Sequence, residues 1–372
     1  MRSNHDVLRR IPNLDILRSL AVIMVMFWHF RMPNGERYLT GFLGDNALWG
    51  VDLFFVLSGY LIGYQLFKSY NTHKKIELCN FYFRRAFRTW PNYFFILALY
   101  FFIPAFREQP ELPPFWKFAT FTQNFGLNFS AFSHAWSLCI EEQFYLVFPL
   151  IALLLLKVSN RRISVAFVFT IILSGIVARG WIWQEVRNGS DSGPYMTWIY
   201  YPTWGRLDGL VCGVSIAAIR VYWSTLWREL EQKGNWLLIA GIAFLGAGFA
   251  LQLHRYDFKA VIFGFPLVSL GFASIVTSAL SPHSWVGGLK IPGAGFLAAI
   301  SFSLYLIHKQ IFHLSASLLG LWQLQAGPLV LVIPFSLSIL AACCLHFVIE
   351  RPFLRLRDRL SIPQIQTLGP SV

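Results

Sequence analysis

Charged residues are scarce in this chain. Only 13% of its 372 residues are Asp, Glu, Lys or Arg, whereas soluble domains contain roughly 25%. Hydrophobic residues make up 56% and aromatic residues 17%, and a water-soluble protein of that composition would expose large apolar patches. The composition therefore excludes a soluble globular enzyme and a disordered chain, and it predicts an all-α, polytopic membrane helical bundle.

Cysteine is also rare. The five cysteines are odd in number and show no C-x-x-C spacing, and four of them lie in apolar runs, where free Cys usually fills space. This pattern predicts neither a disulfide framework nor a zinc site. His308 and His313 are not spaced to bind a metal from one helix face, so no metal is expected.

Acidic residues are outnumbered, 18 against 31 basic ones, which gives a net charge of +13. The basic residues lie mostly between apolar segments, which argues against nucleic acid as the partner. A spanning helix needs about 20 mainly apolar residues, and ten segments approach this length. The first contains charged residues and has no small-residue cleavage site after it, so it is predicted to be a retained helix. The segments are 12–31, 47–67, 90–106, 134–156, 163–183, 200–219, 235–253, 258–280, 294–319 and 328–349.

The distribution of basic residues predicts the orientation. With the N-terminus in the cytoplasm, 20 of the 31 basic residues fall on the inner side, eight on the outer side and three within helices. Because basic residues favour the cytoplasmic side, both termini are predicted to be cytoplasmic. Residues 1–360 then form one integral-membrane domain and 361–372 a short cytoplasmic tail. The segment 107–133 is expected to be an amphipathic or re-entrant segment at the outer interface.

Three ionisable residues interrupt the first apolar segment. Arg18 and His29 are 11 residues apart, about 20° from three full helical turns and about 16 Å along the axis. Asp15 lies on the same face, within about 40°. Ionisable residues inside a bilayer are costly and therefore indicate function, and His suits proton transfer near neutral pH. A packed polar seam with Asp15 paired to Arg18 is the alternative.

Polar residues also mark the second apolar segment and the basic stretch that follows it. Asp52 lies near the expected outer mouth, and Ser58 lies in a small-residue stretch typical of helix packing. Arg85 and Arg88 share one helix face. They are interpreted either as ordinary anchors on the cytoplasmic side or as a clamp for phosphate, which Arg binds in a bidentate manner.

Two adjacent carboxylates, Glu141 and Glu142, lie about two turns into the fourth apolar segment. They point about 100° apart, so only one can face a given site squarely.

Further candidates could equally be buried pairs, packing contacts or interfacial anchors, and the remaining histidines are interpreted as loop or interface residues. The candidates for substrate contacts are Trp136, Trp116, Arg206, Asp208 and His308.

Seven sequence blocks, in this order, resemble the acyltransferase-3 family of integral-membrane acyltransferases. The first block is Arg18, ten residues and then His29. The other six are GVDLFFVLSGYL (50–61), RRAFR (84–88), WSLCIEEQFYL (136–146), GRLDGL (205–210), FSLYLIH (302–308) and IERPF (349–353). The resemblance covers about residues 10–355. It implies about ten transmembrane helices that transfer an acyl group, usually acetyl from acetyl-CoA, to a hydroxyl. Lys309 departs from the hydrophobic or Trp residue expected there.

The resemblance also implies roles for individual residues and for the partners. The acceptor would be a carbohydrate on the outer side, such as a bacterial surface polysaccharide or lipopolysaccharide, and the location the bacterial inner membrane. His29 matches the essential His, Arg18 its partner Arg, Arg85 and Arg88 the donor-binding motif, and Glu141 the fourth-helix acid.

A mechanism follows as a hypothesis. An acceptor hydroxyl needs a base within hydrogen-bond reach, and we expect His29 to be that base, oriented by Glu141 or Asp52. Arg18 and Ser58 would contact the donor in a cavity that also contains His29. Direct transfer and a covalent acetyl-His intermediate both remain open. The alternative function is a secondary transporter or a lipid or glycan flippase, and a third is a non-catalytic scaffold. Binding of acetyl-CoA would distinguish an acyltransferase from a transporter or flippase.

Overall fold

The computed structural model describes residues 12–32, 36, 38, 44, 46–128, 130–158, 160–186, 192–321 and 327–360. This part of the chain is helical and contains no β-strand, and the predicted tail 361–372 lies outside it. The elements in chain order are α1 (Pro12–His29), η1 (Ala47–Trp49), α3 (Gly50–His73), α4 (Leu78–Phe102), η2 (Pro104–Phe106), α5 (Phe115–Ala119), η3 (Ser133–Ala135), α6 (Trp136–Val158), α7 (Arg161–Glu185), α8 (Ser192–Tyr195), η4 (Met196–Tyr200), η5 (Thr203–Gly205), α9 (Asp208–Tyr222), α10 (Ser224–Gln232), α11 (Gly234–Gln252), α12 (Phe258–Leu280), α13 (Ala294–Leu321), α14 (Pro328–Leu345), η6 (His346–Glu350) and α15 (Arg351–Leu360).

Among the described residues, seven helical segments are long and apolar enough to cross a membrane. Helices α9 and α10, bent by 111° at their junction, make an eighth if they are one span. Helices α1 and α4 fall outside this set, since each carries charged side chains among its apolar residues. The prediction of an all-α membrane bundle is confirmed, whereas the count of about ten spans and the cytoplasmic termini remain predictions. The seven are Ala47–His73, Ser133–Val158, Arg161–Glu185, Gly234–Gln252, Phe258–Leu280, Ala294–Gly320 and Pro328–Leu360.

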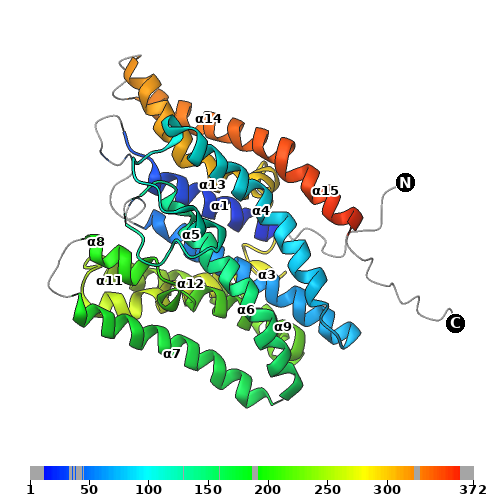
Figure 1. Cartoon of the computed structure of the whole chain (residues 1–372). Coiled ribbons are helices and arrows are strands. Elements are labelled where there is room, and N and C mark those ends of the chain that lie inside the picture. The colour runs from blue at the N-terminus through cyan, green and yellow to red at the C-terminus, as the bar shows by residue number, and fades with distance from the viewer. Residues whose placement is uncertain are drawn as a thin grey trace.

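Helices α1 and α3 occupy the middle of the bundle (Figure 1). One side is formed by α4, α13, α14 and α15, and the opposite side by α7, α11 and α12. Helix α1 packs on α13 and α3, and α3 packs on α9. The two central helices are therefore in contact with both halves of the bundle.

Two glycines allow α3 and α9 to pack closely. A Cβ atom on Gly59 would lie 2.1 Å from the Leu210 carbonyl oxygen, and one on Gly213 would lie 2.1 Å from the Val56 oxygen. Small residues permit such backbone contact between membrane helices. The packing interpretation of this stretch is therefore supported at Gly59, and the neighbouring Ser58 faces α6 instead.

We expect Gly59→Ala to destabilise the fold by about 1–3 kcal/mol, because the new methyl group overpacks the contact between α3 and α9. The thermal unfolding midpoint of the solubilised protein measures this effect. Gly246→Ala on α11 is the matched control, since a Cβ there meets no heavy atom within 4 Å. Equal midpoints for the two variants would contradict the packing assignment.

The segment 107–133, for which an amphipathic or re-entrant segment at the outer interface was expected, packs into the protein. Its described residues contain one α-helix, α5, of five residues, and Phe118, Asn124 and Phe132 are fully buried. The Asn124 amide donates to Thr203 Oγ1 at 2.9 Å, and the Gln143 amide donates to the Phe121 carbonyl at 2.7 Å. Buried backbone needs such partners, so α6 and the segment before α9 hold this segment against the helices.

Candidate active site

A cavity of about 280 Å³ with several charged residues in its lining lies between α1, α3, α4, α6 and α13. Its lining includes three cationic and three acidic side chains, which come from α1, α4 and α6. Five residues predicted from separate motifs therefore meet at one cavity: Arg18, Ser58, Arg85, Arg88 and Glu141. The other charged residues of the lining are Asp15 and Glu142.

The two adjacent carboxylates attach α6 to two different helices. Glu141 accepts a hydrogen bond from Ser58 Oγ at 3.0 Å and another from the Tyr145 hydroxyl. Glu142 accepts from Thr89 Oγ1 at 2.8 Å and from Trp90 Nε1 at 3.1 Å. Both side chains line the cavity, so the choice between Glu141 and Glu142 remains open.

The arginines of α4 divide between the cavity and the surface. Arg85 and Arg88 line the cavity, and Arg85 Nη2 donates to Gln65 Oε1 at 2.7 Å. Arg84 lies outside the lining, with Nη2 3.6 Å from Asp358 Oδ1 and its side chain 45% exposed. The spacing of Arg85 and Arg88 thus places two guanidinium groups beside one polar space, as a clamp for an anionic group requires.

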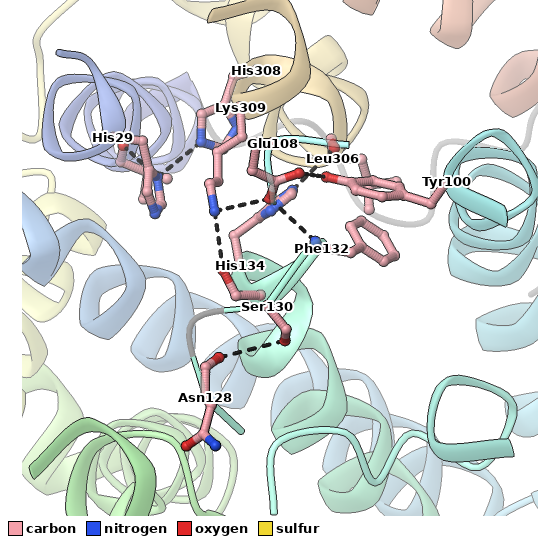
Figure 2. A network of polar contacts seen from close by, with 12 residues as sticks. His29, Tyr100, Glu108, Asn128, Ser130, Phe132, His134, Leu306, His308 and Lys309 are labelled. Atoms are coloured by element: carbon pink, nitrogen blue, oxygen red, sulfur yellow. Dashed lines mark hydrogen bonds and ion pairs between the residues drawn. The ribbon is translucent and has the colours of Figure 1, made fainter. Parts of the chain in front are cut away.

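His29 lies at the end of α1 in a cluster with two other histidines (Figure 2). His308 Nδ1 is 3.1 Å from the Leu304 carbonyl oxygen and 2.8 Å from that of Tyr305. Since carbonyl oxygens only accept, Nδ1 carries the proton, and Nε2 of a neutral His308 is an acceptor. His308 Nε2 lies 2.9 Å from His29 Nδ1.

This contact determines the tautomer of His29. Its Nδ1 must donate to His308 Nε2, and the same nitrogen is 3.1 Å from the Val25 carbonyl oxygen, which also accepts. With the proton on Nδ1, Nε2 of neutral His29 has a lone pair. The arrangement therefore leaves His29 in the form that can take a proton from a hydroxyl.

The predicted orienting contact to His29 is wrong. Glu141 is bonded to Ser58 and Tyr145, and Asp52 is paired with Arg206. The side chain of His29 contacts that of His308 instead. The sequence could not reveal this contact, because the two imidazoles are 279 residues apart.

The predicted common cavity is only partly formed. His29 is not among the cavity-lining residues, whereas Tyr305 is. The Tyr305 hydroxyl donates to the His134 carbonyl at 2.6 Å and lies 2.5 Å from Ser137 Oγ, and its carbonyl accepts from His308. Tyr305 thus lines the cavity and contacts the histidine cluster, so it lies at the boundary between them.

Two buried ion pairs contain three further predicted residues. Asp52 Oδ1 is 3.0 Å from Arg206 Nη2, and Asp208 Oδ2 is 2.7 Å from Arg179 Nη1. None of the four residues lines the cavity. The structure thus brings Asp52, Arg206 and Asp208 into ion pairs between α3, α7 and the start of α9, rather than to the cavity.

The two tryptophans predicted to contact substrate lie apart from each other. Trp136 is 4% exposed, and its ring lies 5.4 Å from the guanidinium carbon of Arg206. Trp116 is exposed, with Lys117 Nζ 6.0 Å from its ring. Trp136 therefore packs around the ion pair of Arg206, and Trp116 remains on the surface of α5.

Two residues of the histidine cluster were not among the predicted site residues. His134, which was interpreted as a loop or interface residue, is 2% exposed, and its ring centroid lies 5.3 Å from that of His308. Lys309 Nζ is 3.0 Å from Glu108 Oε1 and donates to Ser133 Oγ at 3.0 Å (Figure 2). In the sequence, Lys309 departs from the residue expected after His308 in the family pattern. Its ion pair with Glu108 explains how a positive charge is tolerated beside His308.

Within the described part of the chain, no group of three or more His, Cys, Asp or Glu residues is arranged to hold a metal ion. The three histidines contact each other and backbone carbonyls instead.

These features define a class: a multi-pass membrane protein with a charged cavity beside a histidine cluster. A family model described as "Acyltransferase domain" matches residues 11–348. The chain therefore belongs to the acyltransferase-3 family.

Two relatives from Staphylococcus aureus are similar over most of the chain. "Putative O-acetyltransferase SACOL0978" (strain COL) is 28% identical over 379 residues, covering 94% of this chain and 58% of the relative. "O-acetyltransferase OatA" (strain NCTC 8325 / PS 47) is 29% identical over 330 residues, covering 82% of this chain and 51% of the relative. The chain thus spans little more than half the length of these curated relatives. No solved structure matches the chain.

Proposed function

We propose that the protein is a membrane O-acyltransferase that moves an acetyl group from cytoplasmic acetyl-CoA to a hydroxyl of a carbohydrate acceptor. The acceptor class is a bacterial surface polysaccharide or lipopolysaccharide reached from the outer side of the inner membrane. The family membership and the names of the relatives support O-acetylation. The paired arginines of the cavity support a donor with phosphate groups, and the acceptor class is the one that the resemblance to the family implies.

The observation that carries the proposal is the tautomer of His29. His308 and the Val25 carbonyl hold the Nδ1 proton, so Nε2 is the basic nitrogen. An acceptor hydroxyl gives its proton to Nε2 while its oxygen bonds to the thioester carbonyl carbon. The C–S bond then breaks, and the proton passes from the imidazolium to the CoA thiolate, giving the O-acetyl ester and free CoA.

The cavity supplies the donor side of this reaction. Arg85 and Arg88 bind the phosphates of CoA near the mouth, and Arg18 holds the pantetheine arm or the developing oxyanion. Ser58 and Glu141 contribute polar contacts along the same wall. Tyr305 lies where the thioester must pass to reach His29, so its side chain has to turn aside or contact the acyl group.

The O-acetyl content of cell-envelope glycans in producing cells, compared with a deletion strain by NMR, tests the proposed function. Loss of an O-acetyl signal on deletion and its return with the wild-type gene are expected. Unchanged glycans, together with no binding of acetyl-CoA by the purified protein, would contradict the proposal and favour a transporter or flippase.

We expect Arg88→Ala to raise the KM for acetyl-CoA at least tenfold while the KM for the acceptor stays within about twofold, because a charge-assisted phosphate contact contributes about 1.5–3 kcal/mol. Steady-state kinetics on the purified protein measure both constants. Arg84→Ala is the matched control, since Arg84 lies on the same helix but outside the cavity lining. Equal losses for donor and acceptor, or equal losses in the two variants, would contradict the donor assignment.

A further inference from the structure

His134 is a buried histidine with one nitrogen that has no protein partner. Its side chain is 2% exposed, and Nε2 lies 3.1 Å from the Leu306 carbonyl oxygen. Because that oxygen only accepts, Nε2 carries the proton, and Nδ1 of the neutral ring is an acceptor. Nδ1 has no hydrogen-bond partner among the described residues.

The polar groups near His134 already have other partners. Lys309 Nζ contacts Glu108 and Ser133. The Tyr305 hydroxyl donates to the His134 carbonyl rather than to the ring. A buried acceptor without a donor costs free energy, and such groups in native proteins require an explanation. A donor supplied by a bound molecule is the explanation that fits this position.

The position is next to the proposed base. The ring centroids of His134 and His29 are 6.2 Å apart, and those of His134 and His308 are 5.3 Å apart (Figure 2). Each of His29 and His134 has one protonated nitrogen engaged with the protein and one nitrogen able to accept. The cluster therefore has two acceptor nitrogens on neighbouring rings.

We propose that His134 Nδ1 accepts a hydrogen bond from a second hydroxyl of the acceptor, adjacent to the hydroxyl that His29 deprotonates. The inference rests on the proposed function and narrows its substrate to a diol on one sugar residue. His134 is then a substrate-binding residue that selects which hydroxyl is acetylated. Water and simple alcohols, which lack the second hydroxyl, are poor acceptors.

A pair of substitutions distinguishes the two nitrogens of His134. The amide of Asn reaches the position of Nδ1, whereas the amide of Gln reaches the position of Nε2. His134→Asn therefore keeps an acceptor toward the substrate and loses the bond to Leu306, and His134→Gln keeps the bond to Leu306 and loses the acceptor. Both variants, wild type and His29→Ala are expressed in producing cells, and base-released acetate from the envelope glycan is measured at equal protein level.

The expected result is that His134→Gln lowers O-acetylation at least tenfold while His134→Asn retains most of it. The opposite order, or equal acetylation in both variants, overturns the inference, because the nitrogen that matters is then the structural Nε2 or neither. His29→Ala reports on the proposed function separately. If it leaves O-acetylation unchanged, the proposed base is wrong whatever the His134 variants do.

Purified full-length protein with acetyl-CoA gives the second measurement. The probes are an acceptor oligosaccharide prepared from the de-O-acetylated envelope glycan and water, whose use as an acceptor appears as thioester hydrolysis. His134→Gln should raise the KM for the oligosaccharide at least tenfold and lower transfer to the oligosaccharide more than thioester hydrolysis. A parallel fall in transfer and hydrolysis would overturn the role in acceptor binding.

Discussion

A chain carrying His29→Asn is expected to fold normally and to lose acyl transfer by about 10²–10⁴-fold, the range that general-base catalysis contributes. The Asn amide reaches the position of Nδ1 and can still donate to the Val25 carbonyl and to His308. It has no atom at the position of Nε2, so the substitution removes the base and leaves the local contacts intact. Acetyl transfer by the purified protein, at a confirmed folded fraction, measures the loss.

His308 provides the companion test for the tautomer. His308→Gln can still offer an acceptor to the Nδ1 proton of His29, whereas His308→Leu cannot. We expect the Gln variant to keep transfer within about tenfold of wild type and the Leu variant to fall by a further 10–100-fold, in kcat rather than in the KM for acetyl-CoA. Full activity of His29→Asn, or equal activity of the two His308 variants, would contradict the assignment of Nε2 as the base.

Local patterns predicted the helices and much of the cavity. In a bilayer, the backbone N–H and C=O groups must form hydrogen bonds within the chain, which favours helices. Each span is therefore visible in the sequence as a long apolar segment. The 11-residue spacing in α1 and the paired arginines of α4 predicted which side chains share a face. Arg18, Arg85 and Arg88 did meet at one cavity, with Ser58 and Glu141 from two other helices, whereas His29 lies outside its lining.

The contacts between distant helices could not be predicted in this way. His29 and His308 were both candidates, but no periodicity relates the end of α1 to the middle of α13. The same limit applies to the ion pair between Lys309 of α13 and Glu108, which lies in the segment 107–133. A buried polar residue signals only that a partner exists, and the packing of the helices decides which one.

Asp52 illustrates this limit and carries the second large expected effect. Its side chain and that of Arg206 are 4% and 1% exposed, and their charged atoms are 3.0 Å apart. Removing one member of a buried ion pair leaves an uncompensated charge and costs about 3–5 kcal/mol. Asp52→Ala should therefore lower the free energy of unfolding of the solubilised protein by this amount. Glu77→Ala, in the exposed pair with Lys75 at 3.8 Å, should change it by less than about 1 kcal/mol.

A double variant separates the structural role of Asp52 from a catalytic one. Apolar side chains of similar volume often replace a buried ion pair without loss of stability, so Asp52→Leu with Arg206→Met should recover most of the stability lost in Asp52→Ala. Acetyl transfer should return with the folded protein, because neither residue lines the cavity. A double variant that is stable but inactive would instead mean that the carboxylate or the guanidinium group takes part in the reaction. Any loss of acetyl transfer in Asp52→Ala would then come from the missing carboxylate itself rather than from unfolding.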